Sequence, residues 1–379
     1  MSSRPLDFPS KFTCFLHAQE VTFAPGALAR LSEAVERYGW HRFMLCTNRS
    51  MRAAGRVATI ESMLDQRLAA VFDRVQPHVQ DVQVDEAVTL AAERNADAII
   101  GMGGGSPIGM AKAVAARLAE KSSSIPVIAI PTTYAGSEMT AVYGITQTRQ
   151  GQPRKVTFSN PKIAPKLVIY DPVLTLDLPT EMTAATGINA LAHCIEASYS
   201  VNRHPLSTAA AISGVRHIDR ALLRCYTCGD DLEARTEMLL GAHLAGFSLA
   251  SVTMGLHHGL CHVLGGTAKV PHGLANAIIL PHAVRFNAGA TAAQLLPVAE
   301  ALGISVDGRS PAAAVEAAAD RIFELVGQMN LPQRLRDTGV KEADLPYLAQ
   351  LGFQNRTVQG NPRPILEAAQ LEKLLREAW

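Results

Sequence analysis

The chain has 379 residues, enough for two domains or one large one, and 48% of them are hydrophobic, enough for a sizeable core. Its 35 basic and 34 acidic side chains nearly cancel, which argues against nucleic acid as a partner. Gly, Pro or charge interrupts every long apolar run, and residues 1–9 lack the apolar stretch of a signal peptide, so we expect no membrane partner. Six scattered cysteines suit reduced thiols, which predicts a cytoplasmic protein.

Short apolar segments alternate with amphipathic stretches in the first half of the chain. Helical periodicity is clear at 84–95, directly before an apolar segment at 97–101. Strands are expected at 42–47, 69–73, 97–101, 125–130 and 167–170. Strands that alternate with helices predict a parallel sheet covered on both faces, so we expect residues 1–178 to form an α/β domain with a Rossmann-like sheet.

The pattern changes after Leu178. Long Ala- and Leu-rich stretches at 208–223 and 232–253 have helical periodicity and few strand signals. The pair Pro179-Thr180 suits the start of a helix. We therefore expect residues 179–379 to form an all-helical substrate domain, with the cleft between the two domains as the default ligand site.

A glycine loop follows the apolar segment at 97–101 and consists of Gly103, Gly104, Gly105 and Ser106. Glycines let the backbone approach a pyrophosphate, and the free amides at a helix N-terminus supply positive potential. Three consecutive glycines match neither the GxGxxG fingerprint nor a Walker loop, so this loop alone could be a plain connector.

Hydroxyl side chains follow the next predicted strand, at Thr132, Thr133 and Ser137. Hydroxyls at the carboxyl end of a neighbouring strand are typical of nucleotide sites in open α/β sheets. Together with the glycine loop they predict a dinucleotide site.

A histidine-rich segment carries the clearest chemical signal of the second half. His258 and His262 are four residues apart and share one face if the segment is helical, and His272 follows a Gly-Gly turn. Upstream, Asn189 and His193 have the same spacing. With a carboxylate in place of Asn189, this pattern would indicate a catalytic metal site; the alternative is a set of hydrogen-bonded core histidines.

Together these segments resemble the iron-containing (group III) alcohol dehydrogenase family, from about Val21 to the end of the chain. Besides the two loops and the histidines, the resemblance rests on Ala111-Lys112, Tyr170-Asp171-Pro172 and Asn361-Pro362-Arg363. It implies a dehydroquinate synthase-like architecture, an N-terminal domain that binds NAD(P), and a homodimer.

Most members of that family hold a divalent metal through one Asp and three His, and the matching positions here are Asn189, His193, His258 and His272. His262 is the neighbouring cleft histidine. A neutral amide oxygen does not compensate the charge of a divalent ion, so we expect no metal.

One branch of the family, the maleylacetate reductases, has the same Asn and works without metal. This chain also resembles that branch at 131–140, 142–146 and 254–262. The segment Pro271-His272-Gly273 instead resembles the metal-dependent members.

The resemblance implies an NAD(P)H-dependent reductase of maleylacetate, or of a closely related unsaturated keto acid, that gives a 3-oxoadipate-type product in aromatic-compound degradation. His258 and His262, with Asn189 and His193, would stabilise an enolate and supply a proton. His272 belongs to the same set. The alternatives are a metal-dependent (Fe or Zn) alcohol dehydrogenase and an inactive nucleotide-binding relative.

Four further residues complete the expected site. Tyr143, on an expected loop, could hydrogen-bond the substrate, and Lys155 aligns with a family lysine near the cofactor. Asn48 stands where NAD-preferring members often place an Asp against the ribose 2′-hydroxyl, so NADH or NADPH should serve. A keto-dicarboxylate also needs cations, for which Lys155 and Arg363 are candidates.

Overall fold

The structure is a computed structural model that describes residues 12–120, 125–149 and 152–379, without the side chains of residues 148, 149 and 152–155. The chain divides into two compact units. The α/β unit is His17–Leu178, and the helical unit is Pro179–Trp379 with Met1–Leu16, described from Phe12.

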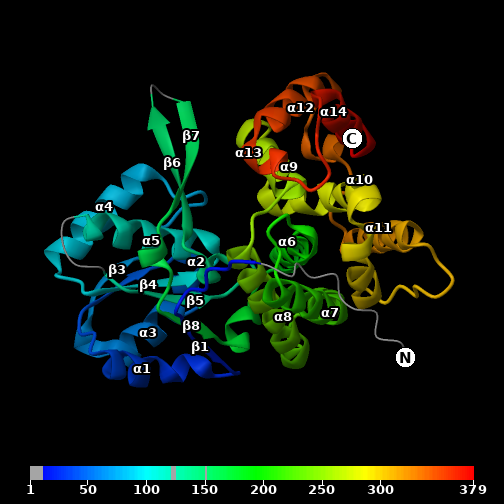
Figure 1. The fold of residues 1–379 in the computed structure, drawn as a ribbon. Helices are drawn as coiled ribbons and strands as arrows, with labels where there is room; N and C mark the ends of the chain where they lie inside the picture. The colour runs from blue at the N-terminus through cyan, green and yellow to red at the C-terminus, as the bar shows by residue number, and fades with distance from the viewer. Residues whose placement is uncertain (1–11, 121–124, 150–151) are drawn as a thin grey trace. The chain divides into compact units, whose positions relative to one another are not determined.

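A parallel sheet forms the centre of the α/β unit, with strand order β1-β8-β5-β4-β2-β3 (Figure 1). The parallel sheet expected from the sequence is confirmed, but β1, β6 and β7 were not expected. The last two pair as a separate antiparallel hairpin. The elements are β1 (Glu20–Phe23), α1 (Leu31–Tyr38), β2 (Phe43–Cys46), α2 (Arg49–Ala53), α3 (Arg56–Leu64), β3 (Leu68–Phe72), α4 (Asp81–Glu93), β4 (Ala98–Gly103), α5 (Gly105–Ala119), β5 (Val127–Pro131), β6 (Val142–Arg149), β7 (Gln152–Ser159) and β8 (Leu167–Tyr170).

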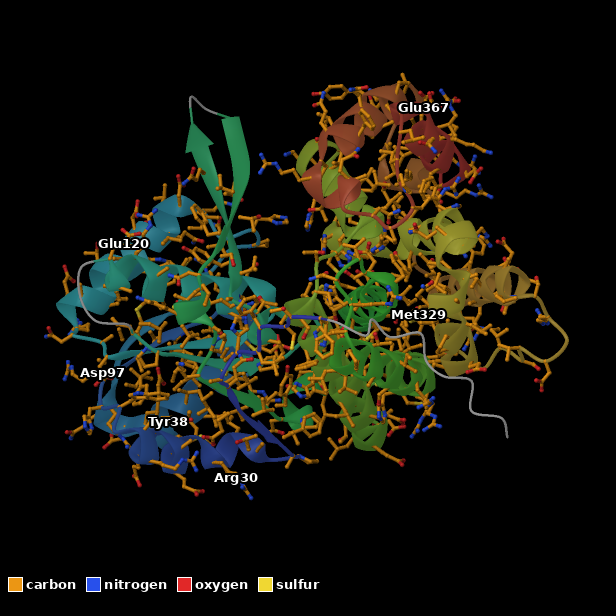
Figure 2. The ribbon with its side chains drawn as sticks, viewed as in Figure 1. Arg30, Tyr38, Asp97, Glu120, Met329 and Glu367 are labelled. Carbon is orange, nitrogen blue, oxygen red and sulfur yellow. The ribbon has the colours of Figure 1, made fainter. Side chains whose placement is uncertain are left out.

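Side chains of each central strand alternate between the two faces of this sheet. In β2, Met44 and Cys46 pack with α4 and α5, whereas Phe43 and Leu45 pack with α1 and α3 on the other face. Figure 1 shows these two pairs of helices on opposite faces of the sheet. Figure 2 shows the side chains that fill these layers. Because both faces are covered, the strands are continuous apolar runs, which made them visible in the sequence.

Helices make up the unit after Leu178, as expected. Helix α6 packs against α7, α8 and α10. The approach of α7 to α6 requires Gly214, where a Cβ would lie 2.6 Å from Sγ of Cys194. The helices are α6 (Thr180–Tyr199), α7 (Pro205–Thr227), α8 (Leu232–Ser251), α9 (Leu256–Thr267), α10 (His272–Ala301), α11 (Pro311–Gln328), α12 (Leu345–Gln354), α13 (Arg356–Gln359) and α14 (Ala368–Glu377).

A helix that spans a membrane must be both long and apolar. No single helix among the described residues is both long and apolar enough to cross a membrane. Helices α8 and α9 meet both requirements only when they are taken together as a pair, and the pair is bent by 95° at the break between them.

Candidate active site

The glycine loop joins β4 to α5 with a backbone that only glycine adopts easily. Gly103 has φ of 138°, and a Cβ there would lie 2.8 Å from Cγ of Pro107. Gly104 is the N-cap of α5, and no described side chain caps this helix. Gly105 and Ser106 form its first turn, whose amide groups are therefore available to an anion.

The loop after β5 lies directly beside the glycine loop. The amide of Thr132 donates to the carbonyl of Gly103 at 3.0 Å. A Cβ on Gly104 would lie 3.2 Å from Cγ2 of Thr133. The structure thus brings together both predicted loops at the carboxyl ends of adjacent strands, the usual place for a nucleotide in such a sheet.

Lys112 fixes the remainder of that second loop. Its fully buried Nζ donates to the carbonyl and Oγ of Ser137 at 2.5 and 3.1 Å, to Oγ1 of Thr140 at 3.1 Å, and to the carbonyl of Val142 at 2.8 Å. Burial lowers the pKa of Lys112 to about 7, although the carboxyl of Glu138 opposes this shift. The hydroxyl of Ser137, expected to bind the cofactor, is thus held by Lys112 in this structure.

Asn48 lies at the same edge of the sheet and has a local partner. Its Oδ1 accepts from the amide of Met51 at 3.2 Å and from Oγ of Ser50 at 2.7 Å, as the N-cap of α2. The preceding Thr47 donates from Oγ1 to the carbonyl of Met102 at 2.8 Å, which joins the end of β2 to β4. The proposed contact of Asn48 with a ribose stays a prediction.

Tyr143 and Lys155 both belong to the β6–β7 hairpin, so the prediction that Tyr143 lies on a loop was wrong. The ring of Tyr143 is half-buried and stacks on Phe158, with 5.3 Å between centroids, and burial raises its pKa. Lys155 pairs with Thr146 in the hairpin, and its side chain lies outside the described residues. Both belong to the α/β unit, whereas the predicted histidines belong to the helical unit.

Four histidines of the helical unit form the histidine cluster: His193, His258, His262 and His272. The rings of His193 and His258 stack with centroids 4.6 Å apart and planes 11° from parallel. The ring centroid of His258 lies 6.5 Å from that of His262 and 6.2 Å from that of His272. The centroids of His262 and His272 lie 5.8 Å apart. Helices α6, α9 and the first residue of α10 supply these rings, so the structure brings together histidines that are far apart in the chain.

The buried end of this cluster contains polar atoms that lack partners. His193, His258 and Asn189 are buried, His272 is half-buried and His262 is exposed. Within the described chain, Oδ1 of Asn189, Nδ1 of His193 and Nε2 of His258 are buried without a hydrogen-bond partner. Burial, with the neighbouring His258 and His272, holds the pKa of His193 well below its usual value. Buried polar atoms are normally hydrogen-bonded, so these three atoms indicate a site for a polar ligand.

Glu196, which the sequence reasoning missed, lies under the histidine cluster. Its Oε1 accepts from the amides of Gly255 and His257 at 3.0 and 3.1 Å. Its Oε2 accepts from the amide and from Nδ1 of His258 at 3.1 and 2.5 Å. The signal was present in the sequence, because Asn189, His193 and Glu196 have the i, i+4, i+7 spacing of one helix face.

The charges in this buried group oppose each other. Burial works to raise the pKa of Glu196, but hydrogen bonds from His257 and His258 outweigh it and hold that pKa far below its usual value. Burial also lowers the pKa of His258, against the effect of the Glu196 carboxylate. His257 is oriented separately, because its Nε2 donates to the carbonyl of Asn276 at 3.2 Å.

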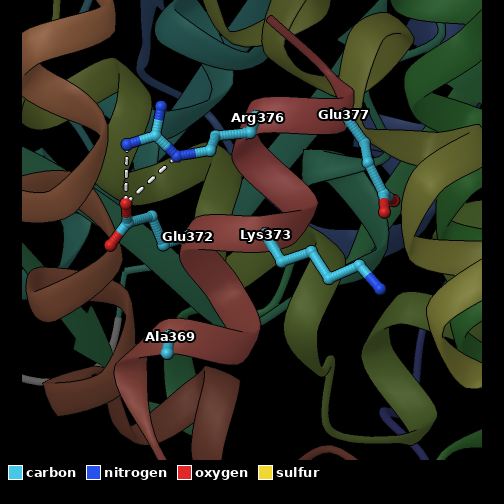
Figure 3. A pocket seen from close by; sticks show the side chains of 5 residues that line it. All are labelled: Ala369, Glu372, Lys373, Arg376 and Glu377. Atoms are coloured by element: carbon cyan, nitrogen blue, oxygen red, sulfur yellow. Dashed lines mark hydrogen bonds and ion pairs between the residues drawn. The ribbon is translucent and has the colours of Figure 1, made fainter.

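Arg363, a candidate for binding a substrate carboxylate, has a structural partner instead. Its guanidinium donates to the carbonyl of Phe286 and lies 4.2 Å from the centre of that ring. The surface pocket in Figure 3 is also no match for the predicted site, because residues of α14 line it. There Arg376 donates to Glu372 at 2.8 Å.

Comparison with known proteins identifies the family. The profile described as iron-containing alcohol dehydrogenase matches residues 18–172, and the profile of the C-terminal part of the Fe-containing alcohol dehydrogenase family matches residues 183–379. The chain belongs to the iron-containing alcohol dehydrogenase family. It is therefore an oxidoreductase, as the sequence predicted.

Members of this family with different activities are similar to the chain. A maleylacetate reductase of Pseudomonas knackmussii is 38% identical over 96% of this chain and 97% of its own length. A 1,3-propanediol dehydrogenase of Citrobacter freundii is 33% identical over 94% of this chain and 96% of its own. The crystal structure of a maleylacetate reductase from Agrobacterium tumefaciens covers 98% of this chain and 99% of its own, with a TM-score of 0.87 and 33% identity.

The family name implies a metal ion, but the side chains at the matching positions include no anionic ligand for a divalent cation. Neutral imidazoles do not compensate the charge of a divalent ion. Asn189 adds only a neutral oxygen.

A second group of potential ligands was not considered in the sequence reasoning. Among the described residues, ligand atoms of Glu196, His257 and His258 lie within 4.8 Å of one another. Both oxygens of Glu196 already accept hydrogen bonds from the start of α9. A cation bound there would displace them, so this group fits a helix cap better than a metal site, and the expected absence of metal stays a prediction.

Proposed function

We propose that this enzyme uses NADH or NADPH to reduce maleylacetate, or a closely related unsaturated keto acid, to a 3-oxoadipate-type product in the degradation of aromatic compounds. We further propose that it does so without a metal ion. The observation that carries the proposal is a neutral Asn189 with His193 and His258, each of which has a buried polar atom without a partner among the described residues, in a chain 38% identical to a maleylacetate reductase.

The reaction adds one hydride and one proton across a conjugated double bond. In 4-oxohex-2-enedioate the hydride goes to C2, which is β to the ketone, and the electron pair moves to the ketone oxygen to form an enolate. A proton then goes to C3 and gives 3-oxoadipate. The protein must therefore hold the nicotinamide, stabilise a developing oxyanion and supply one proton.

The α/β unit supports the first of these tasks. The amides of Gly105 and Ser106 at the start of α5 suit the pyrophosphate, beside the hydroxyls of Thr132 and Thr133. The half-buried Asn48 suits a ribose without repelling a 2′-phosphate.

The histidine cluster supports the other two tasks. His258 takes up a proton at Nε2 and releases that proton to C3. The Glu196 carboxylate, bound to Nδ1 of the same ring, stabilises the imidazolium. Asn189 and His193 offer polar groups to the enolate oxygen. The exposed His262 exchanges protons with solvent. Because an imidazolium supplies the positive charge, this scheme has no step that needs a metal.

The direct test is to follow both transferred hydrogens. The purified enzyme is given maleylacetate with NADH deuterated at C4 of the nicotinamide, and separately with unlabelled NADH in D₂O. We expect 3-oxoadipate with one deuterium at C2 of the former alkene in the first case and at C3 in the second. Absence of NADH and NADPH oxidation with maleylacetate would contradict the proposal.

A metal-dependent alcohol dehydrogenase is the second candidate. The segment Pro271-His272-Gly273 and the 33% identity to a 1,3-propanediol dehydrogenase favour it. It predicts oxidation of 1,3-propanediol by NAD⁺ that depends on added Fe²⁺ or Zn²⁺. The same assay with both substrates, before and after chelation, separates the candidates, and inactivity with both leaves the non-catalytic relative.

A further inference from the structure

We infer that Glu196 is a positioning residue that fixes the ring orientation and the tautomer of His258, so that Nε2 is the only nitrogen of this ring available to a reacting molecule. The role in turnover rests on the proposed function. The structural part does not, because it concerns hydrogen bonds within the protein.

The carboxylate of Glu196 is itself held rigidly. It is 1% exposed, and its two oxygens accept hydrogen bonds from three backbone amides at the start of α9, those of Gly255, His257 and His258. Three fixed donors on two oxygens leave the carboxylate no freedom to rotate. The hydroxyl of Tyr199 donates to Oε1 at 3.5 Å as well. Nδ1 of His258, 2.5 Å from Oε2, therefore meets an acceptor of fixed position.

This contact determines where the proton of His258 resides. A carboxylate only accepts, so Nδ1 must carry a hydrogen, and the neutral ring then has its lone pair on Nε2. Nε2 is the buried atom that lacks a partner in the described chain. The adjacent Nδ1 of His257 lies 3.3 Å from the same ring's Nδ1. Because Nε2 of His257 donates to the carbonyl of Asn276, this Nδ1 can only accept in the neutral ring, which also places the hydrogen on Nδ1 of His258.

The consequence for turnover is a single route for the proton. In the neutral ring Nε2 accepts a proton, and in the imidazolium it donates that proton to C3 of the enolate, while Nδ1–H stays on Glu196. The carboxylate remains ionised throughout and touches no substrate. Glu196 also caps α9, so a purely structural role is the rival explanation.

The first turn of α9 also offers a matched control for a purely structural role of Glu196. The Oδ1 of Asn361 accepts from the amide of Leu256 at 3.3 Å, and its side chain also bonds Asn287. Asn361→Ala therefore weakens the start of α9 but leaves the contact between Glu196 and His258 in place. Glu196→Gln keeps the size of the side chain, and its amide nitrogen faces Nδ1 of His258 as a donor.

The first measurement uses the unchanged enzyme and needs no substrate. Nitrogen-15 NMR of histidine-labelled protein, with His258 assigned by loss of its signals in His258→Asn, reports which ring nitrogen is protonated. We expect Nδ1 protonated and Nε2 unprotonated in the neutral ring. Protonation of Nε2 instead would overturn the inference even if no variant folds.

The second measurement compares the two variants with maleylacetate. We expect Glu196→Gln to convert His258 to the Nε2-protonated tautomer and to lower kcat about 10- to 100-fold, with KM and the Kd of NADPH within about threefold of wild type. Asn361→Ala should lower Tm but keep the tautomer and kcat. An unchanged tautomer in Glu196→Gln, or equal kcat losses in both variants, would contradict positioning. If wild type does not reduce maleylacetate, the proposed function fails while the tautomer result still decides the role of Glu196.

Discussion

The two units differ in the kind of polar group that they offer to a ligand. In the α/β unit the available groups are mostly backbone amides at the start of α5, and the polar side chains nearby, Asn48 and Ser137, already have partners within the protein. In the helical unit the available groups are side-chain atoms of Asn189, His193 and His258. Substitutions in the first unit should therefore change cofactor affinity, and substitutions in the second should change the rate of chemistry.

The largest expected effect comes from His258. His258→Ala should fold, bind NADPH normally and lose at least about 100-fold in kcat on maleylacetate, because it removes the group that stabilises the enolate and supplies its proton. His262→Ala should lose less, since water can replace an exposed imidazole. Stopped-flow single turnovers and a fluorescence titration with NADPH measure the two properties. Turnover of His258→Ala within about threefold of wild type, with a lower Tm, would make this ring a packing residue instead.

Gly105 provides the corresponding test in the α/β unit. A Cβ there would meet only Cβ of Ala135 at 3.8 Å, an ordinary contact, so Gly105→Val should fold. Its branched side chain would occupy the space next to the amides of α5, and we expect the Kd of NADPH to rise at least about tenfold. Gly289→Ala, at a position with nothing within 4 Å, is the control. Unchanged affinity in folded Gly105→Val would show that the loop is only a connector.

The pH dependence of turnover sharpens the contrast further. A proton donor must be protonated, so kcat/KM should fall as the pH rises through the pKa of free His258, which burial lowers below 6.5. A bound dianion favours the imidazolium, so the limb in kcat should lie at higher pH than the limb in kcat/KM. In Glu196→Gln both limbs should move to lower pH. Coincident limbs in the wild type would indicate that His258 does not face the substrate charge.

The smallest expected effect concerns the choice of cofactor. Asn48→Asp keeps the N-cap of α2, because Asp caps a helix as well as Asn does. The new carboxylate would accept from a ribose 2′-hydroxyl but repel a 2′-phosphate, and the ratio of kcat/KM for NADH over NADPH should rise about fivefold or more. Asp73→Asn removes a half-buried charge that is paired with Arg52 directly after neighbouring β3, and it tests whether general charge explains the change. If the ratio is unaltered by Asn48→Asp, the end of β2 does not contact the ribose.

Sequence alone sufficed where the physical signal is local. Continuous apolar runs predicted the central strands, and the turn before α5 was clear because Gly103 needs a positive φ. The β6–β7 hairpin was missed because its strands are partly polar and lie outside the six-stranded sheet. Which residues of the two strands face each other depends on the pairing register, and no local sequence pattern reveals that register.

The sequence predicted several residues of the site but not the hydrogen bonds that hold them in place. The i/i+4 spacing brought out His258 and His262, and polarity brought out Asn189 and His193. Glu196 was passed over because a single carboxylate in an apolar helix gives no sign that it will meet the start of α9, 59 residues later at Gly255. The contact arises only in the folded chain, where Glu196 of α6 meets the start of α9.

The most direct test of this account is whether the histidine cluster works without a metal. Purified enzyme should be dialysed exhaustively against a chelator, its Fe and Zn measured by plasma mass spectrometry, and its kcat on maleylacetate compared with that of untreated enzyme. Because Asn189 is neutral, we expect less than about one-tenth equivalent of metal and an unchanged kcat. Stoichiometric metal whose removal abolishes turnover, and whose return restores it, would contradict the account.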